Sequence, residues 1–510
     1  MPPTIELVGR GPITLEEALI AEKNIVNLAS YRSAHDLFDQ ELWGQRDSIQ
    51  TLVKRHLALG SQSMCIVLPP EHWTRGGFNV CVLVEVQCGN VSKKVTFRCP
   101  MPHKVAEARY PGSAHEKLST EVGAYIWVEE NCPEIRSPHL FGFGTSDGRH
   151  FTHTDHMSFF TRLARQFWRH VYRVLQRPLL SKYIRHRLPC QMSSAYMILE
   201  WLGPDTGQML STTFHTYRDN KDYRARLFRG MSRTMLSLAR IPQQRIGSFQ
   251  FHDDGTITLT NRPLSCSTMI LENDGAPRTM QRDETLSCTD AYASDLLTFH
   301  DRRFLSQPHA AHDESDCRAQ MAAKALLRVE SHNHIRRELR DGPFVLQLTD
   351  FHASNILVDE QWNITGLIDL EWICALPAEM LSVPYWLTGC SIDGIEDEKY
   401  DQYDEVRREF MEIFTEEEEA AQGRTQHGIS LSNIMRDMWD SKGVWFWHCL
   451  SSINAMYFLP ESHLLPPDFL TLEAESIVSR LWCRDSEDVV RRKIADKQAY
   501  DDELRKLFGS

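Results

Sequence analysis

Two short apolar runs separated by a polar stretch constrain this chain more than any other feature of its sequence. Residues 356–358 (Ile-Leu-Val) form the first run, and residues 364–368 (Ile-Thr-Gly-Leu-Ile) form the second. Two such runs around a polar turn predict a β-hairpin. Folding the hairpin brings Asn355, before the first strand, beside Asp369, after the second strand. Asp350 lies five residues before Asn355, so three oxygen-bearing side chains are expected at one end of the hairpin.

Carboxylate and amide oxygens in this arrangement suit a magnesium-dependent reaction on a phosphate. Mg²⁺ takes oxygen ligands and is commonly held by one or two carboxylates together with substrate phosphates. Asp369 and Asn355 can supply the protein ligands, which leaves Asp350 free to accept a proton from an attacking hydroxyl. Phosphoryl transfer needs little beyond such positioning and charge stabilisation. The alternative is a plain β-hairpin with solvated acidic side chains.

The segment 348–355, Leu-Thr-Asp-Phe-His-Ala-Ser-Asn, resembles the catalytic loop of the aminoglycoside phosphotransferase-like kinases, specifically a fungal branch of that family. The usual loop of the family reads His-Gly-Asp-Leu-His-x-x-Asn. The resemblance implies that Asp350 is the catalytic base, that Asn355 and Asp369 are metal ligands, and that ATP and Mg²⁺ are the cofactors. Leu348 replaces the family's first histidine, which mainly supports the loop.

The resemblance also implies an α+β, two-lobed protein kinase-like fold with a small β-rich N-lobe and a larger helical C-lobe. We expect an N-terminal helical extension over residues 1–60, where Thr14 to Glu17 has the form of a capping box. The N-lobe is expected over residues 61–200, with a basic helical insertion at about 155–190. The C-lobe, with the catalytic loop, metal site and acceptor pocket, is expected over residues 201–510.

Two strands, at residues 78–86 and 94–98, are predicted in the N-lobe, followed by a helix that opens with a second capping-box pattern at Ser113 to Glu116. By resemblance, the turn at Gly76 and Gly77 covers the nucleotide.

The resemblance also implies that Arg98, on the second strand, pairs with Glu121 on the helix to grip the α- and β-phosphates. Arg98 replaces the usual lysine, and the planar guanidinium is not interchangeable with an ammonium. The strand that ends at Glu200 is predicted to form the hinge beside the adenine.

The basic insertion is expected to contain an amphipathic helix, because five arginines recur every three or four residues between Arg162 and Arg177. An apolar stripe that includes Phe160 and Phe167 recurs on the opposite side. We expect this stripe to dock on the first lobe and the arginines to be solvated. Peripheral contact of the helix, over residues 160–177, with an anionic membrane is the less favoured alternative. A contact with the acidic stretch at residues 396–419 is also open.

Composition limits the remaining classes. The net charge of −13 disfavours nucleic acid as a partner, and 13 scattered cysteines without a Cys-x-x-Cys pair argue against zinc ribbons and a disulfide framework. No apolar run approaches the roughly 20 residues of a transmembrane segment, and no secretory signal opens the sequence. We therefore expect a cytoplasmic protein with reduced thiols.

The sequence thus predicts a kinase that transfers the γ-phosphoryl group of ATP to a hydroxyl of a small-molecule acceptor. The alternative is a catalytically impaired pseudokinase that binds a nucleotide or a partner, which the changes at Leu348 and Arg98 would favour. A protein kinase is disfavoured, because Leu370-Glu-Trp372 stands where Asp369 would be followed by Phe-Gly.

Overall fold

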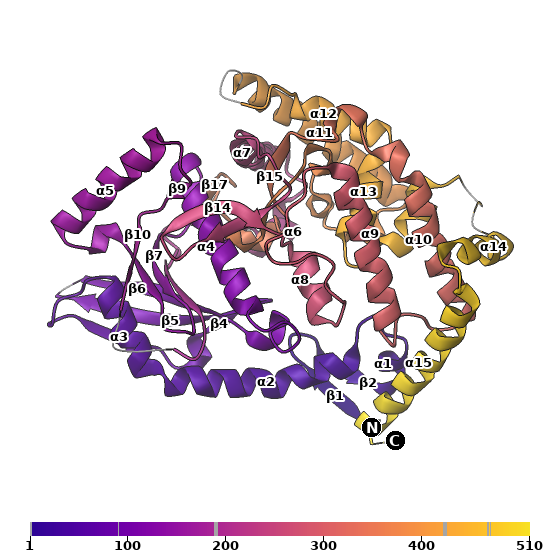
Figure 1. Ribbon diagram of the computed structural model, residues 1–510, viewed down its shortest axis with the longest axis horizontal. Coiled ribbons are helices and arrows are strands. Elements are labelled where there is room, and N and C mark those ends of the chain that lie inside the picture. Colours follow the sequence, from indigo (N-terminus) through magenta and orange to yellow (C-terminus); the bar gives the residue numbers. More distant parts are fainter. Residues whose placement is uncertain are drawn as a thin grey trace.

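The computed structural model describes residues 3–89, 91–187, 192–421, 426–466, 469 and 471–509, and it shows a two-lobed α+β fold (Figure 1). The N-lobe is built on an eight-stranded sheet with the strand order β10-β8-β7-β11-β6-β5-β3, in which β4 also pairs with β5. Its strands are β3 (Met64–Val67), β4 (Thr74–Arg75), β5 (Asn79–Cys88), β6 (Val91–Pro100), β7 (Leu140–Gly144), β8 (His150–His153), β10 (Tyr183–His186) and β11 (Tyr196–Glu200). The predicted strand pair is confirmed as the antiparallel β5–β6 hairpin.

The alternation of side chains along β5 explains which elements cover the two faces of this sheet. Val80, Val82, Val84 and Val86 point to one face and are fully buried against α2 (Ile25–Gly44) and α3 (Arg46–His56). Successive side chains of a strand point to opposite faces of the sheet, so Cys81 points to the face opposite these valines. Arg98 pairs with Cys81 across β5 and β6 and lies on that second face. The predicted helix is confirmed as α4 (Ser113–Asn131), which carries Glu121.

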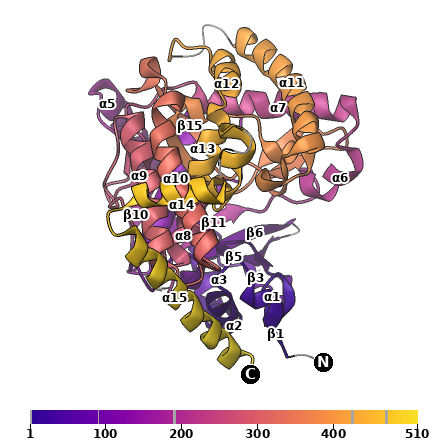
Figure 2. The ribbon, with the colours of Figure 1, turned by 90° about the vertical axis from the view of Figure 1, so that its right-hand side faces the viewer.

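The N-terminal extension begins with a hairpin that helical spacing did not predict, formed by β1 (Thr4–Leu7) and β2 (Gly11–Thr14). Thr14 and Glu17 then form the predicted capping box at the start of α1 (Leu15–Leu19). The extension also contacts the C-terminal helix α15 (Ser486–Leu507), because the Tyr500 hydroxyl accepts a hydrogen bond from the backbone N–H of Ile25 at 2.8 Å. The two ends of the chain therefore lie side by side (Figures 1 and 2).

The C-lobe is mainly helical and carries two small sheets. Its sheets have the orders β12-β16-β17 and β15-β18-β13-β14-β9. The strands are β9 (Leu179–Leu180), β12 (Gln208–Met209), β13 (Gly247–Phe251), β14 (Thr256–Asn261), β15 (Phe344–Leu348), β16 (Ile356–Val358), β17 (Ile364–Leu367) and β18 (Ile373–Pro377). The helices are α6 (Phe214–Tyr217), α7 (Lys221–Ala239), α8 (Cys266–Asn273), α9 (Thr289–Ser306), α10 (Glu314–His334), α11 (Asp397–Ala420), α12 (Leu431–Asp440), α13 (Gly443–Ser451) and α14 (Leu472–Trp482).

One hydrophobic cluster joins the lobes, because α4 packs on β13 and contributes Val122 and Ile126 to the same core as the C-lobe helices. The aromatic segment on α13 belongs to this core: Trp445, Phe446 and Trp447 are all at most 3% exposed. The catalytic loop and α4 are thus held by one continuous apolar interior.

The second predicted capping box, at Ser113 to Glu116, is wrong. The N-cap of α4 is Gly112, in a left-handed conformation, and its backbone N–H bonds to the side chain of Glu107 at 2.5 Å. Glu116 instead accepts a 2.7 Å hydrogen bond from Arg262 in the protein interior. A buried guanidinium stabilises the Glu116 carboxylate more than one backbone N–H would. Glu116 therefore pairs with the distant Arg262 and does not cap α4.

The basic insertion forms helix α5 (Phe159–Val174), but the expected orientation is wrong. Arg165 and Arg169 reach inward to backbone carbonyl groups, whereas Phe160 and Phe167 are 79% and 61% exposed. The carbonyl groups of the segment after the helix need donors, and the arginines supply them. Residues 188–190, at the end of the expected insertion, lie outside the described residues.

The acidic stretch is helical rather than a loop and forms most of α11. Its glutamates meet arginines of α7, where Arg224 pairs with Glu409 and both Arg229 and Arg233 pair with Glu417. The arginine of α5 that forms an ion pair, Arg169, contacts Glu130 of α4. The acidic stretch therefore pairs with arginines of α7, and no ion pair joins the described residues of the acidic and basic segments. All twelve cysteines in the described part of the chain are free.

Gly123 allows α4 to approach β13 closely, and this contact can be tested. A Cβ at Gly123 would lie 2.6 Å from Cβ of Phe249, closer than two carbon atoms can pack. Gly123→Ala is expected to destabilise the protein by about 1–3 kcal/mol, measured by urea unfolding. Gly44→Ala is the control, since its Cβ would meet nothing within 4 Å. Equal midpoints for Gly123→Ala and the wild type would contradict the packing.

Candidate active site

The predicted hairpin is confirmed by strands β16 and β17, which pair with Ile356 opposite Leu367. The backbone N–H of Ile368 donates to the carbonyl of Asn355 at 3.0 Å, which extends the pairing one step beyond the strands. Asn355 and Asp369 therefore lie at the same end of the hairpin, as the sequence predicted. This geometry follows from a short turn between two apolar runs.

Asp350 lies on the loop between β15 and the hairpin, in direct contact with Asn355. The Asn355 amide donates to the backbone carbonyl of Asp350 at 3.0 Å and to its carboxylate at 3.3 Å. Burial raises the pKa of Asp350; His352 opposes this effect, and the negative charges of Glu371 and Asp369 add to it. Asp350 and Asp369 are thus close enough for one carboxylate to influence the ionisation of the other.

Three hydrogen bonds hold the loop around Asp350 in place. Thr349 donates from both its backbone N–H and its hydroxyl to the carbonyl of Trp372, at 3.0 Å each. The indole N–H of Trp386 donates to the carbonyl of Phe351 at 2.6 Å. Leu348 ends strand β15 and pairs with Ile373. The loop is therefore anchored on both sides of Asp350 by hydrogen bonds to residues that follow Asp369 in the sequence.

Asp369 has an unusual backbone conformation, with φ 63° and ψ 64° in the left-handed region. Aspartate is among the few residues other than glycine that occupy this region, and such strained positions cluster at functional sites. The conformation turns the chain from β17 into a single 3₁₀ turn, Leu370–Trp372. The Asp369 carboxylate forms an ion pair with Arg98 of the N-lobe and remains 30% exposed.

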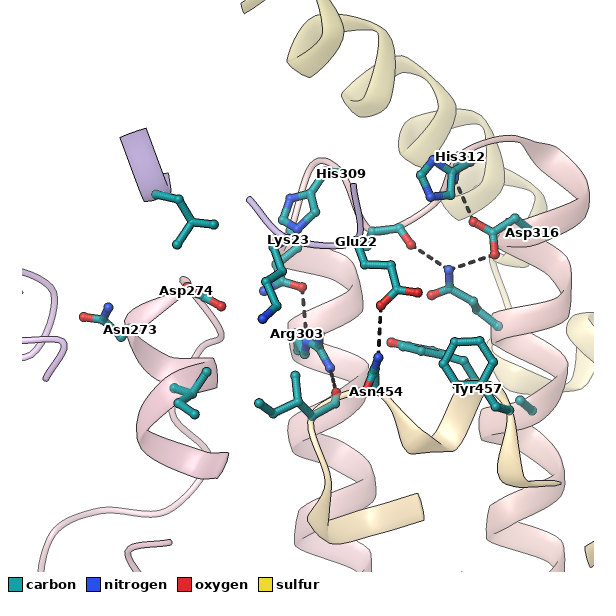
Figure 3. A pocket seen from close by; sticks show the side chains of 18 of the residues that line it. Glu22, Lys23, Asn273, Asp274, Arg303, His309, His312, Asp316, Asn454 and Tyr457 are labelled. Atoms are coloured by element: carbon teal, nitrogen blue, oxygen red, sulfur yellow. Dashed lines mark hydrogen bonds between the residues drawn. The ribbon is translucent and has the colours of Figure 1, made fainter. Parts of the chain in front are cut away.

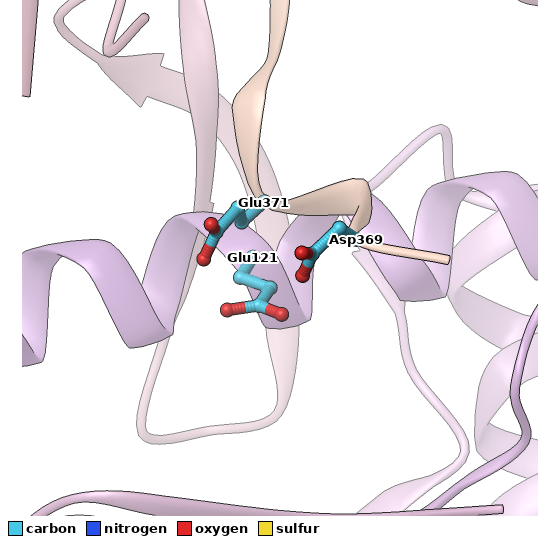
Figure 4. A group of neighbouring side chains, drawn as sticks. All are labelled: Glu121, Asp369 and Glu371. Atoms are coloured by element: carbon cyan, nitrogen blue, oxygen red, sulfur yellow. The ribbon is translucent and has the colours of Figure 1, made fainter. Parts of the chain in front are cut away.

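The predicted pair of Arg98 and Glu121 is present, with 3.5 Å between Nη1 and Oε1. Arg98 also contacts Glu371 at 3.0 Å, so one buried guanidinium joins β6, α4 and the segment after the hairpin. Burial opposes the charge of Arg98, but Asp369, Glu121 and Glu371 outweigh it and raise its pKa well above the ordinary value. Figure 4 shows these three carboxylates converging from α4 and from the turn after β17.

Sequence reasoning missed three members of this network: Asn79, Lys117 and Glu371. Lys117 forms ion pairs with Glu371 and, at 3.2 Å, with Glu121. Asn79, the first residue of β5, accepts a 3.0 Å hydrogen bond from Lys117 and donates to Glu371 at 2.9 Å. The spacing of Lys117 and Glu121, four residues apart on one helix, was the available signal. The other two residues are joined only by the tertiary fold.

The network contains one more carboxylate than it contains cations. Burial opposes the ionisation of Glu371, but Lys117 and Arg98 outweigh it and lower its pKa. Burial likewise opposes the charge of Lys117, yet Glu121 and Glu371 raise its pKa. Two cations therefore face three carboxylates, and Asp369 is the one with the most exposure among them.

Two donor sets near Asp369 fit a hard, oxygen-preferring cation such as Mg²⁺. Oxygen atoms of Glu121, Asp369 and Glu371 lie within 4.8 Å of one another. All three pair with Arg98, but the side chains of Glu121 and Glu371 are at most 3% exposed, whereas that of Asp369 is 30% exposed and remains accessible to a cation. The amide nitrogen of Asn355 bonds to Asp350, which leaves its oxygen available. Asp369 with Asn355 is therefore the better fit.

The other predicted site residues lie outside the ion-pair network. Gly76 forms the turn between β4 and β5, where its N–H donates to the carbonyl of Asn79 at 3.0 Å. Beside Gly77, the ring of Phe78 packs edge-on against Trp372, with 4.7 Å between the ring centres, so the turn lies against the segment that follows Asp369. Glu200 bonds to Arg136 at 2.6 Å and to the backbone N–H of His139 at 3.1 Å.

Two cavities lie on opposite sides of α8. The smaller, of about 260 Å³, has Asp350 in its wall together with Thr349, Tyr385, Trp386 and Ser451. The larger, of about 630 Å³, lies between the N-terminal extension and helices α8–α10, and Figure 3 shows Lys23, Asp274, Arg303 and His309 around it. Gly77 lines this larger cavity, whereas Asp350, Asn355 and Asp369 do not. The smaller cavity is therefore the one next to the candidate catalytic group.

Comparison with known families agrees with this geometry. Residues 195–378 match the model of the phosphotransferase enzyme family, a segment that runs from β11 past the catalytic loop and hairpin. This match covers about a third of the chain and agrees with the predicted resemblance to the phosphotransferase family within that segment. The fungal branch stays a prediction. Arg98 and Glu121 precede the matched segment.

Two further comparisons complete the picture. The structure is similar to that of an ethanolamine kinase from Plasmodium vivax, with a TM-score of 0.35 and 11% sequence identity over 85% of each chain. No curated protein sequence matches the chain.

The buried network can be tested through Lys117, which is 1% exposed. Lys117→Met leaves Glu371 and Glu121 with one fewer cation and is expected to destabilise the protein by about 3–5 kcal/mol, since breaking a buried ion pair strands a charge. Urea unfolding measures the change, and Lys117→Met combined with Glu371→Gln is expected to recover part of it. Lys399→Met, at an exposed position of α11, is the control. Wild-type stability in the Lys117 variant would contradict the network.

Proposed function

We propose that this protein transfers the γ-phosphoryl group of ATP to a hydroxyl group of a small molecule. The observation that carries the proposal is the position of Asp350. It lines a cavity of about 260 Å³ on one side and contacts Asn355 on the other. A hydroxyl held in that cavity would therefore lie beside the candidate base, which itself contacts a candidate metal ligand. The match of residues 195–378 to the phosphotransferase family model supports the same reaction class.

Each residue has a distinct role in this proposal. Asp350 orients the acceptor hydroxyl and takes its proton, and its raised pKa makes it a better proton acceptor than an ordinary aspartate. Asn355 and Asp369 would hold Mg²⁺, which neutralises charge on the phosphates when it is bound. Arg98, placed by Glu121, would bind the phosphates with its planar guanidinium. The turn at Gly76 and Gly77 would close over the nucleotide, and the hinge that begins at Glu200 would border the adenine.

The cavity beside Asp350 suits a small acceptor. Its volume of about 260 Å³ falls below the range of pockets that enclose drug-sized ligands. Aromatic side chains of Phe351, Tyr385 and Trp386 line it together with the hydroxyl groups of Thr268 and Ser451. Apolar walls with a few polar groups are typical of sites that bind and orient one small molecule. A metabolite extract incubated with the protein and ATP should therefore contain a product heavier by one phosphate, detected by mass spectrometry.

Two aspartate substitutions separate catalysis from nucleotide binding. Asp350→Asn is expected to lower turnover by about 10²- to 10⁴-fold, the range of a lost general base, while Mg-ATP affinity stays near that of the wild type. Asp369→Asn is expected to weaken Mg-ATP binding itself, because it removes a carboxylate ligand. Turnover is measured as the rate of ADP formation with the identified acceptor, and binding is measured by calorimetry.

Asp341→Asn is the matched control. Asp341 is exposed and precedes strand β15, whereas the loop with Asp350 follows that strand. Its turnover and Mg-ATP affinity should equal those of the wild type. Unchanged turnover in both site variants would contradict the assigned roles. Mg-ATP binding by the wild type with no product from any acceptor would favour the pseudokinase alternative.

A further inference from the structure

Helix α5 presents an apolar face to solvent, which is unusual for a well-packed protein. None of its residues is buried. Large apolar side chains that are more than half exposed occur along the helix and its last turn: Phe159, Phe160, Leu163, Phe167, Trp168, Val174 and Leu175. Contiguous exposed apolar surface of this kind marks an interaction site more often than an incidental surface. Figure 1 shows α5 at the outer edge of the molecule, with no other element beyond it.

The polar side of α5 fixes this orientation. Arg165 donates to the backbone carbonyl groups of Ser181 and Tyr183 at 2.8 Å each. Arg169 donates to the carbonyl of Leu180 at 2.9 Å and forms an ion pair with Glu130. Rolling the helix to bury its apolar face would leave these carbonyl groups without donors and expose the arginines. The apolar face is therefore held outward by specific hydrogen bonds.

The charge around the helix identifies the chemistry of a partner. The chain has a net charge of −13, yet residues 156–199 contain eight lysines and arginines and no acidic residue. Arg173, Arg177 and Arg187 are exposed, and none of them forms an ion pair with a described carboxylate. An acidic protein with one basic, apolar edge is attracted to a negatively charged surface in a single orientation.

We propose that α5 docks this protein on the surface of an anionic lipid membrane. An amphipathic helix with Phe, Leu and Trp on one side and arginines beside them inserts its apolar face at the boundary of headgroups and acyl chains. Trp168 is suited to that boundary, where indole rings concentrate. Within the described residues no helix is long and apolar enough to cross a membrane, so the contact is peripheral. A second copy of the chain fits less well, because it would place two basic segments face to face.

The test uses the whole protein with vesicles of phosphatidylcholine alone or of phosphatidylcholine mixed with phosphatidylserine. We expect sedimentation with the anionic vesicles and much weaker binding to the neutral ones. Phe160→Ser combined with Phe167→Ser is expected to lower the partition coefficient at least about tenfold, because two exposed aromatic side chains no longer enter the bilayer. Arg173→Gln combined with Arg177→Gln is expected to lower it by a similar factor on anionic vesicles only.

Leu472→Ser combined with Leu481→Ser is the matched control. Both leucines are at least 75% exposed on α14, far from the basic segment in the sequence, and their loss should leave binding unchanged. All of these side chains are exposed, so circular dichroism should show native folding in each variant. Failure of the folded wild type to bind anionic vesicles would overturn the proposal. So would equal binding by the phenylalanine variant, or a dimer in solution that the same variant abolishes.

Discussion

The structure depends on two buried cations, Arg98 and Lys117, placed between three carboxylates. Arg98 comes from the sheet of the N-lobe, Lys117 and Glu121 come from α4, and the remaining carboxylates follow the hairpin of the C-lobe. Removing any member would leave a charge in a poorly solvated place, so the network holds the lobes and α4 in one register. Asp369, which pairs with Arg98, is also the residue in the left-handed backbone conformation.

The positions of Asn355 and Asp369 were predictable because they depend on residues that lie close together in the sequence. The hairpin follows from two apolar runs and a turn, and Asn355 and Asp369 meet whenever that hairpin forms. The partnership of Arg98 and Glu121 came from the family resemblance and not from spacing, since the two residues lie on different elements. Lys117 was within reach of a spacing argument, whereas Asn79 and Glu371 required the tertiary fold. The assigned roles of all these residues remain proposals.

Helix α5 shows why the amphipathic pattern alone failed. The pattern located the helix and its two opposed faces. We then expected the apolar face to be the buried one, and it is exposed. The segment after the helix places backbone carbonyl groups near α5. Arginine side chains donate hydrogen bonds to these carbonyl groups, and phenylalanine side chains have no donor. The second capping box at Glu116 failed for a related reason, because a distant arginine competed with the local backbone. Both errors concern hydrogen-bond partners that lie far apart in the sequence.

The central claim is that Asp369 and Asn355 form a metal site that binds ATP together with Mg²⁺. Isothermal titration calorimetry of the purified protein with ATP, in the presence and absence of Mg²⁺, tests it most directly. The account predicts saturable binding that requires the metal, because the carboxylate-rich network would otherwise repel the triphosphate. Absence of binding under both conditions, or equal affinity with and without Mg²⁺, would contradict it.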